Sequence, residues 1–328
     1  MANRVKVTML GVSGSGKTSF MTCMYGMMSW GDSLKGFLLT SEDTAQSQKL
    51  LAAWEDLMDE DGREWPASTA GETATYEFNL NHGTSPIIGF DWMDYRGGAI
   101  KDRNVNAPDF IELQDRLKAS SSIFICVSGE RLATPIKSAD VARIGVTNIN
   151  NLLVNTFNPG SNNPPALVIV ITKYDKCSHR SKAEIVADVK RLFPSWFAEQ
   201  SGWLVLICPV TLGANLSENE LLGEIEPSGL HVPVIFSLAA ELSRQNRTTF
   251  DSQQVRIANL SQLKSSFISR LFKRSEIDSR EMDLNRMDAK IKIVNKDLDN
   301  LFNILSSDTQ VTLCFNGKES TFGEIFDV

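Results

Sequence analysis

The strongest constraint on the fold is a glycine-rich segment near the start of the chain. Residues 11–18 read Gly-Val-Ser-Gly-Ser-Gly-Lys-Thr, which matches the pattern GxxxxGK[ST]. An alternating, β-branched stretch at residues 4–10 precedes this segment, and a helical stretch at about 17–30 follows it. A strand, a tight turn and a helix in this order predict an α/β fold, in which helices cover a sheet.

The same segment carries groups that bind phosphate. Small residues allow successive backbone N–H groups to approach phosphate oxygens, and the following helix N-terminus adds its dipole. Lys17 supplies a positive charge for the β and γ phosphates, and the Thr18 hydroxyl can coordinate Mg²⁺. We therefore expect nucleotide contacts from this turn and the helix start: Gly11, Ser13, Gly14, Ser15, Gly16, Lys17, Thr18 and Ser19.

Apolar runs alternate with helical segments along the next 200 or so residues. Five further stretches read as strands: 73–80, 87–94, 123–128, 166–172 and 204–210. The last three are almost continuously apolar, which is typical of parallel strands buried on both faces. Helices are expected at about 106–119, 138–156 and 181–199. The pattern predicts a mostly parallel sheet flanked by helices.

The pattern changes near residue 235 and becomes mostly helical. We expect a domain over residues 1–235, with an insertion around 130–163, and a helical extension over 236–328 that ends in a short strand-like stretch. A helix at about 280–306 has apolar residues at alternating gaps of three and four, which is a heptad pattern. This seam can support self-association as a coiled coil. Phe302 and Ile304 broaden its apolar face and favour packing on the chain's own helices.

Composition excludes several classes of protein. The 328 residues include 33 Lys and Arg against 40 Asp and Glu, and a net charge of −7 disfavours nucleic-acid binding. The five cysteines are scattered without a CxxC pair, which is typical of reduced thiols in a cytoplasmic protein. No stretch approaches the ~18 apolar residues of a membrane helix, so we expect no membrane insertion.

A second motif follows the predicted strand at 87–94. Residues 94–97 read Asp-Tyr-Arg-Gly and match DxxG. The carboxylate of Asp94 can hold Mg²⁺ through water, and the backbone N–H of Gly97 can meet a γ-phosphate.

A third motif follows the predicted strand at 166–172. Residues 172–175 read Thr-Lys-Tyr-Asp and match [NT]KxD. A carboxylate at Asp175 can accept hydrogen bonds from guanine N1–H and N2–H₂ together, a pair that adenine does not offer. The stem of Lys173 can cover the base. Ligands of open α/β sheets bind at the carboxyl ends of strands, where all three motifs stand.

Together the three motifs resemble those of phosphate-loop GTPases of the translation-factor and Ras-like (TRAFAC) class, over about residues 4–235. Three short stretches are similar in sequence to bacterial double-GTPases and conflict-system GTPases: residues 65–69 (WPAST), 94–98 (DYRGG) and 229–236 (GLHVPVIF). The resemblance implies a G domain that binds GTP and GDP with Mg²⁺ and acts as a molecular switch.

The resemblance also implies further site residues. Thr172, Thr211 and Leu212 would lie near the base, the last two in the position of a loop whose backbone contacts guanine O6. A threonine that completes the Mg²⁺ site would be Thr69, with Thr73 as the alternative.

One departure from the family pattern concerns hydrolysis. Ras-like proteins place a glutamine after the DxxG glycine to orient the attacking water, and this chain has Gly98 there. Arg96, Glu72 and Arg103 are candidates to replace it, and Lys17, Thr69 and Arg96 are the expected catalytic residues. We expect slow GTP hydrolysis that a partner protein or a second protomer completes. A non-hydrolysing scaffold that binds guanine nucleotide is the alternative, and Asp175 argues against a third possibility, an ATP-dependent enzyme such as a kinase.

Overall fold

The fold is built on a nine-stranded sheet. A computed structural model describes residues 4–31, 34, 36–59, 62–66, 74–94, 108–157, 164–213, 216, 223–265 and 274–326. Within these residues the strand order is β2-β3-β4-β1-β5-β6-β7-β8-β9. The strands are β1 Val5–Leu10, β2 Phe37–Ser41, β3 Ala74–His82, β4 Ser85–Asp94, β5 Ser122–Ser128, β6 Ala166–Thr172, β7 Leu204–Pro209, β8 Thr312–Phe315 and β9 Lys318–Ser320.

The centre of the sheet is parallel and both edges are antiparallel. Strands β4, β1, β5, β6 and β7 run in one direction. On one edge β3 and β2 are added antiparallel, and on the other edge β8 and β9 are. Every residue of β5 and β6 is buried, as expected for strands covered on both faces. The predicted parallel sheet is therefore its central part.

Helices cover both faces of the sheet. They are α1 Lys17–Trp30, α2 Thr44–Met58, α3 Pro108–Lys118, α4 Ser138–Ile144, α5 Val146–Thr156, α6 Lys182–Leu192, α7 Val232–Ser265, α9 Arg274–Leu305 and α10 Phe322–Phe326. Side chains of α1, α2, α7 and α9 form one apolar core with the sheet. Side chains of α3, α5 and α6 form a second core on the other face.

Two predicted helices are shorter than the sequence pattern suggested. The stretch 138–156 is divided into α4 and α5 because Gly145 adopts a left-handed conformation with φ of 75°. The helix expected over 181–199 ends at Leu192, because Pro194 disfavours helical backbone at Phe193.

The sequence analysis missed β2 and α2, which lie between α1 and β3. Asp43 caps α2, and its side chain accepts hydrogen bonds from the backbone N–H groups of Ala45 and Gln46. Strand β2 lengthens the sheet by pairing with β3.

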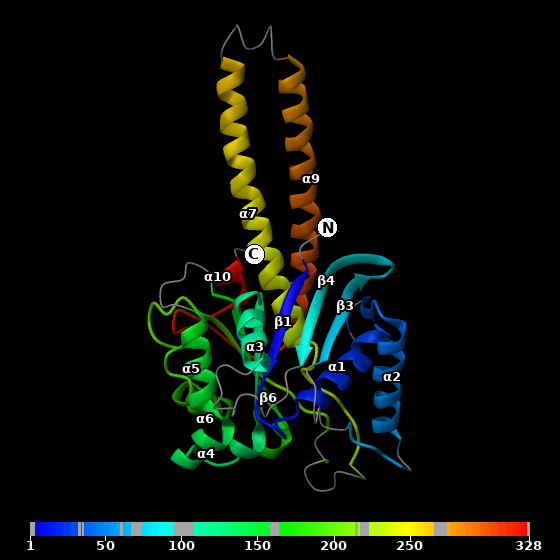
Figure 1. Cartoon of the computed structure of the whole chain (residues 1–328), viewed down its shortest axis with the longest axis vertical. Helices are drawn as coiled ribbons and strands as arrows, with labels where there is room; N and C mark the ends of the chain where they lie inside the picture. Colours follow the sequence, from blue (N-terminus) through cyan, green and yellow to red (C-terminus); the bar gives the residue numbers. More distant parts are fainter. Residues whose placement is uncertain are drawn as a thin grey trace.

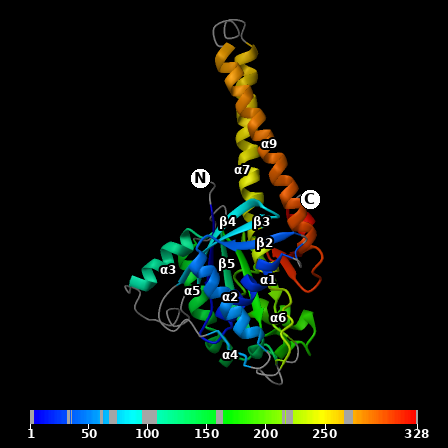
Figure 2. The same ribbon diagram turned by 90° about the vertical axis from the view of Figure 1, so that its right-hand side faces the viewer.

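Helices α7 and α9 form a long arm. They pack against each other and extend beyond the amino-terminal end of β1, away from the carboxyl ends of the parallel strands (Figures 1 and 2). The seam residues Leu298, Leu301 and Leu305 are buried. The expected packing of this seam on the chain's own helices is therefore confirmed, while self-association stays a prediction.

After the arm the chain returns to the sheet. The strand-like end expected at residues 311–317 is β8, which pairs with β7 so that Leu313 lies opposite Leu206. The domain boundary at residue 235 stays a prediction, and the segment that follows it contributes both the arm and an edge of the same sheet.

All five cysteines are buried and form no disulfide. Among the helices described, none combines the length and the apolar character that a membrane span requires.

Candidate functional site

The turn between β1 and α1 needs glycine at two positions. A Cβ at Gly11 would lie 2.6 Å from the Ser15 Oγ and 3.1 Å from the Cys126 carbonyl oxygen. Gly16 caps α1 with a left-handed φ of 81°, and a Cβ there would lie 3.2 Å from the Thr172 Cβ. The glycines thus let the turn pack closely against the ends of β5 and β6.

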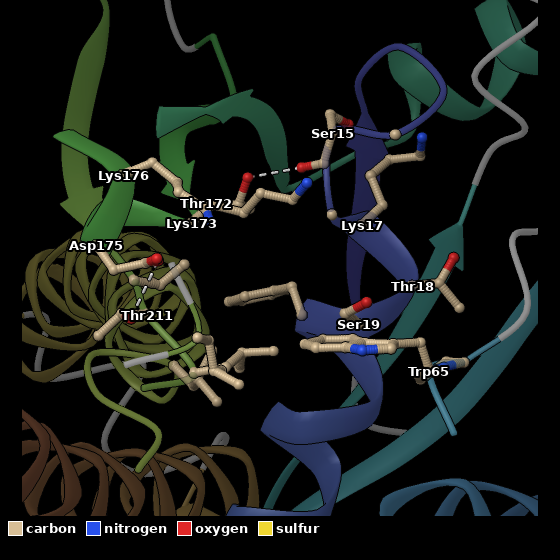
Figure 3. Close-up of a pocket in the computed structure, with 18 of the residues that line it drawn as sticks. Ser15, Lys17, Thr18, Ser19, Trp65, Thr172, Lys173, Asp175, Lys176 and Thr211 are labelled. Atoms are coloured by element: carbon tan, nitrogen blue, oxygen red, sulfur yellow. Dashed lines mark hydrogen bonds between the residues drawn. The ribbon is translucent and has the colours of Figure 1, made fainter. Parts of the chain in front are cut away.

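Side chains fix this turn from both sides (Figure 3). The Thr172 hydroxyl donates to the Ser15 carbonyl oxygen at 2.7 Å. The buried ammonium group of Lys17 donates to the carbonyl oxygens of Gly11 at 2.9 Å and Val12 at 3.4 Å. The lysine therefore folds back across the turn and holds its positive charge there.

A cavity of about 290 Å³ opens beside this turn. Four segments far apart in the sequence line it: the turn with the start of α1, the segment after α2, the loop after β6, and the segment after β7. Twelve of the residues predicted from the sequence meet here: Ser13, Gly14, Ser15, Gly16, Lys17, Thr18, Ser19, Thr172, Lys173, Asp175, Thr211 and Leu212. The glycine turn and the motif at 172–175 thus converge on one space at the carboxyl ends of the strands, as predicted from their positions.

Asp175 lies across the cavity from the turn, beside Thr211 (Figure 3). Its Oδ1 accepts a hydrogen bond of 3.5 Å from the Thr211 hydroxyl. Burial raises the pKa of the Asp175 carboxyl above its ordinary value, although the positive charge of Lys176 opposes the shift. The backbone N–H of Tyr174 donates to the Val210 carbonyl oxygen at 3.1 Å, which joins the loop after β6 to the end of β7.

Lys173 has an unusual backbone and an acidic partner. Its φ is 50°, in the left-handed region. Its ammonium group forms an ion pair of 2.9 Å with Glu130, which lies in the turn after β5. Burial raises the pKa of the Glu130 carboxyl. The hydrogen bond from Lys173 and the positive charge of Lys173 lower this pKa by more, so it lies below its ordinary value. The pair fixes the lysine stem at the edge of the cavity.

Asp94 ends β4 and is fully buried, outside the lining of the cavity. It lies opposite Met9 of β1, the strand that leads into the glycine turn. Burial raises the pKa of the Cys126 thiol to about 12, while Lys17 lowers it and Asp94 raises it. Both charges therefore act on the same thiol beneath the turn.

Several predicted residues lie outside the described part of the chain. These are the two threonine candidates, Thr69 and Thr73, and the residues around the DxxG glycine: Glu72, Arg96, Gly97, Gly98 and Arg103.

The cavity also contains apolar residues that sequence reasoning missed. They are Phe20, Trp65, Pro66, Leu216 and Leu230, and Lys176 lines the cavity with them. Trp65 lies on the α1 side of the cavity, across from Asp175 and Thr211 (Figure 3). Trp65 and Pro66 had a signal in the sequence, because they open the stretch at 65–69 that resembles double-GTPases.

Comparison with known proteins identifies a family. The family model described as Double-GTPase 2 matches residues 6–202, which is more than half of the chain. A search of curated proteins gave no match. The matched region contains the glycine turn, Asp94 and the loop with Asp175, while Thr211, Leu212 and the arm lie beyond it.

Proposed function

We propose that the cavity binds GTP and GDP with Mg²⁺ and that the protein slowly hydrolyses GTP to GDP and phosphate. The chain belongs to the Double-GTPase 2 family and so contains a GTPase domain. One observation carries the proposal. The cavity places the lysine-bearing glycine turn on one side and the Asp175–Thr211 pair on the other, so one ligand can meet both a phosphate site and a base site.

At the phosphate end, each residue has a distinct role. Backbone N–H groups of residues 13–18 and the ammonium group of Lys17 bind the phosphate oxygens. The buried hydroxyl of Ser15 has no hydrogen-bond partner among the described residues, which fits a turn built to meet a polar ligand.

Hydroxyl and carboxylate oxygens are the ligands that Mg²⁺ prefers, and the chain offers Thr18 at the helix start and buried Asp94 at the end of β4. Thr69, or alternatively Thr73, would complete this set. When bound, the ion would neutralise charge on the β and γ phosphates.

At the base end, the Asp175 carboxylate accepts from the two adjacent N–H donors of guanine. Its half-buried position strengthens this recognition, because a carboxylate with reduced access to water gains more from a charged hydrogen bond. Trp65 and Leu212 provide apolar walls for a planar base.

Gly98 in place of the usual glutamine supports slow hydrolysis by the isolated chain. Arg96 is the proposed replacement within the chain, and a partner protein or a second copy is the proposed source of further acceleration. The arm carries exposed Phe250, Val255 and Ile293, which give a partner apolar side chains to bind.

The base assignment is tested with Asp175→Asn. The variant replaces an acceptor with an amide, so it should lose preference for GTP and gain relative affinity for xanthosine triphosphate, whose 2-position is a carbonyl. Calorimetry with both nucleotides measures the ratio, and Asp115→Asn on the surface of α3 is the matched control. Unchanged discrimination by Asp175→Asn would contradict the role of this carboxylate.

A non-hydrolysing scaffold is the second candidate, because a chain with Gly98 in place of the water-orienting glutamine can also bind GTP without turnover. Single-turnover release of phosphate from prebound GTP separates the two functions. Measurable release above the rate in solution supports the GTPase, and its absence with intact GTP binding supports the scaffold.

A further inference from the structure

A buried arginine links two segments that line the cavity. Arg63 is only 9% exposed. Its Nε donates to the Leu57 carbonyl oxygen at 3.0 Å, and its Nη1 donates to the carbonyl oxygen of Gly223, 160 positions away in the sequence. We refer to Arg63 and these two carbonyl groups as the Arg63 clasp.

On one side the clasp fixes the segment that carries Trp65. Helix α2 ends at Met58, and the chain then folds back on it, since the backbone N–H of Glu64 donates to the Asp56 carbonyl oxygen at 3.1 Å. Trp65 follows directly and lines the cavity with Pro66. Arg63 is therefore two residues from an aromatic wall of the site.

On the other side the clasp holds the segment paired with the base loop. Thr211 and Ser228 exchange two backbone hydrogen bonds of 3.2 and 2.9 Å, and Glu226 N–H donates to the Leu212 carbonyl oxygen at 2.7 Å. A Cβ at Gly213 would lie 2.0 Å from the Glu224 carbonyl oxygen, so the two strands of chain are in tight contact. Gly223 is thus coupled to Thr211 and Leu212.

We propose that Arg63 is a positioning residue that holds the Trp65 wall and the Thr211–Leu212 wall together and thereby slows the release of bound guanine nucleotide. This inference rests on the proposed function. A ligand between the two walls leaves most readily when they separate, and separation breaks the hydrogen bond from Arg63 to the Gly223 carbonyl oxygen. A buried guanidinium group that loses a carbonyl acceptor is costly, so the clasp favours the closed arrangement.

Arginine suits this role because of its shape. The guanidinium group is planar and directs several donors along fixed directions, so it can bind carbonyl oxygens of two segments at once. A lysine ammonium group keeps the charge but not this geometry. Arg63→Lys is therefore a conservative variant that tests the geometry and not the charge.

The experiment measures how fast a fluorescent GDP derivative leaves the full-length protein in Mg²⁺ buffer after excess unlabelled GDP is added. The variants are Arg63→Lys, Arg63→Ala, Trp65→Ala and the double variant Arg63→Ala/Trp65→Ala. Arg143→Ala is the matched control, because Arg143 is exposed on α4 and pairs only with Asp140 among the described contacts. Loss of a charged hydrogen bond predicts roughly ten- to hundredfold faster release for Arg63→Ala.

The double variant separates positioning from general stability. If Arg63 acts by placing Trp65, the double variant should release GDP no faster than the faster single variant. Multiplicative effects of the two substitutions would show that Arg63 does not act through Trp65 and would overturn the inference. If Arg63→Ala fails to fold, the release rate of Arg63→Lys decides, with thermal melting of the nucleotide-free protein as the check on folding.

Failure of this inference is distinguishable from failure of the proposed function. A wild-type protein that does not retain labelled GDP contradicts the proposed function and, with it, the clasp. A wild-type protein that retains GDP, with Arg63 variants that release it at the wild-type rate, contradicts the clasp alone.

Discussion

Substitution of Gly26 by alanine sets helix propensity against packing. Gly26 lies in the middle of α1, where alanine should stabilise the helix by about 1 kcal/mol. However, a Cβ at Gly26 would lie 2.4, 2.5 and 2.7 Å from Cγ, Cδ2 and Cδ1 of Trp54 in α2. These ring atoms are close to the tryptophan backbone, so a rotation of the far end of the ring cannot relieve the contact.

The packing effect should win. Overpacking of this kind costs about 1–3 kcal/mol, and three ring atoms well inside contact distance place Gly26→Ala in the upper part of that range. Subtracting the gain in propensity, we expect a net loss of stability of about 1–2 kcal/mol. The melting temperature should then fall by roughly 1.5–3 °C, measured by calorimetry or circular dichroism.

A second background makes this reasoning refutable. When Trp54→Ala removes the ring, Gly26→Ala should instead raise stability by about 1 kcal/mol, because only the propensity term remains. The sign of the substitution therefore reverses between the two backgrounds. Stabilisation by Gly26→Ala in the wild type, or equal effects in both backgrounds, would show that α1 and α2 do not meet at this pair.

Three predictions concern the ligand. Lys17→Ala removes the charge held across the glycine turn and should weaken GTP binding by roughly 100-fold or more in calorimetry; equal affinities would contradict the phosphate assignment. Because burial raises the pKa of Asp175 above 3.8 and guanine recognition needs the carboxylate, GTP affinity should fall as pH is lowered towards that raised pKa, before an ordinary aspartate would protonate. The GTP affinity of Asp175→Asn should not fall in this pH range. An equal fall in the variant would show that another group causes the pH dependence. Dilute wild-type protein should hydrolyse GTP slowly and faster per molecule at higher protein concentration or with a partner, since groups supplied in trans contribute about 10³–10⁵ in Ras-like proteins; a fast, concentration-independent rate that is lost in Arg96→Ala would contradict this.

The central strands could be predicted from sequence because their physics is simple. Strands β5 and β6 are buried on both faces, so their apolar runs are uninterrupted. Helix α2 was missed because only Leu50 and Leu57 are buried along its 15 residues, which leaves a weak apolar pattern. The break at Gly145 could not be distinguished from a glycine tolerated within a helix, because that choice depends on its left-handed backbone.

The candidate site divides in the same way. The glycine turn and the loop with Asp175 have local patterns, and a shared sheet edge brings them together. The place of Trp65 in the cavity has no such local pattern, because Arg63, two residues before it, bonds to Gly223 in a distant segment. A contact between residues 160 positions apart is a property of the folded chain, and a single sequence contains no period or motif that marks it.

The return of the chain to the sheet after α9 makes the arm an insertion between neighbouring strands, not a terminal appendage. A protein shortened at residue 235 would lose two strands together with the arm and would leave β7 as an open edge for aggregation. An internal deletion that joins α7 to α9 close to the sheet would keep that edge covered. The arm can therefore gain or lose whole helical turns in both helices during evolution without any change in strand order. The length of the arm can thus change without a change in the cavity.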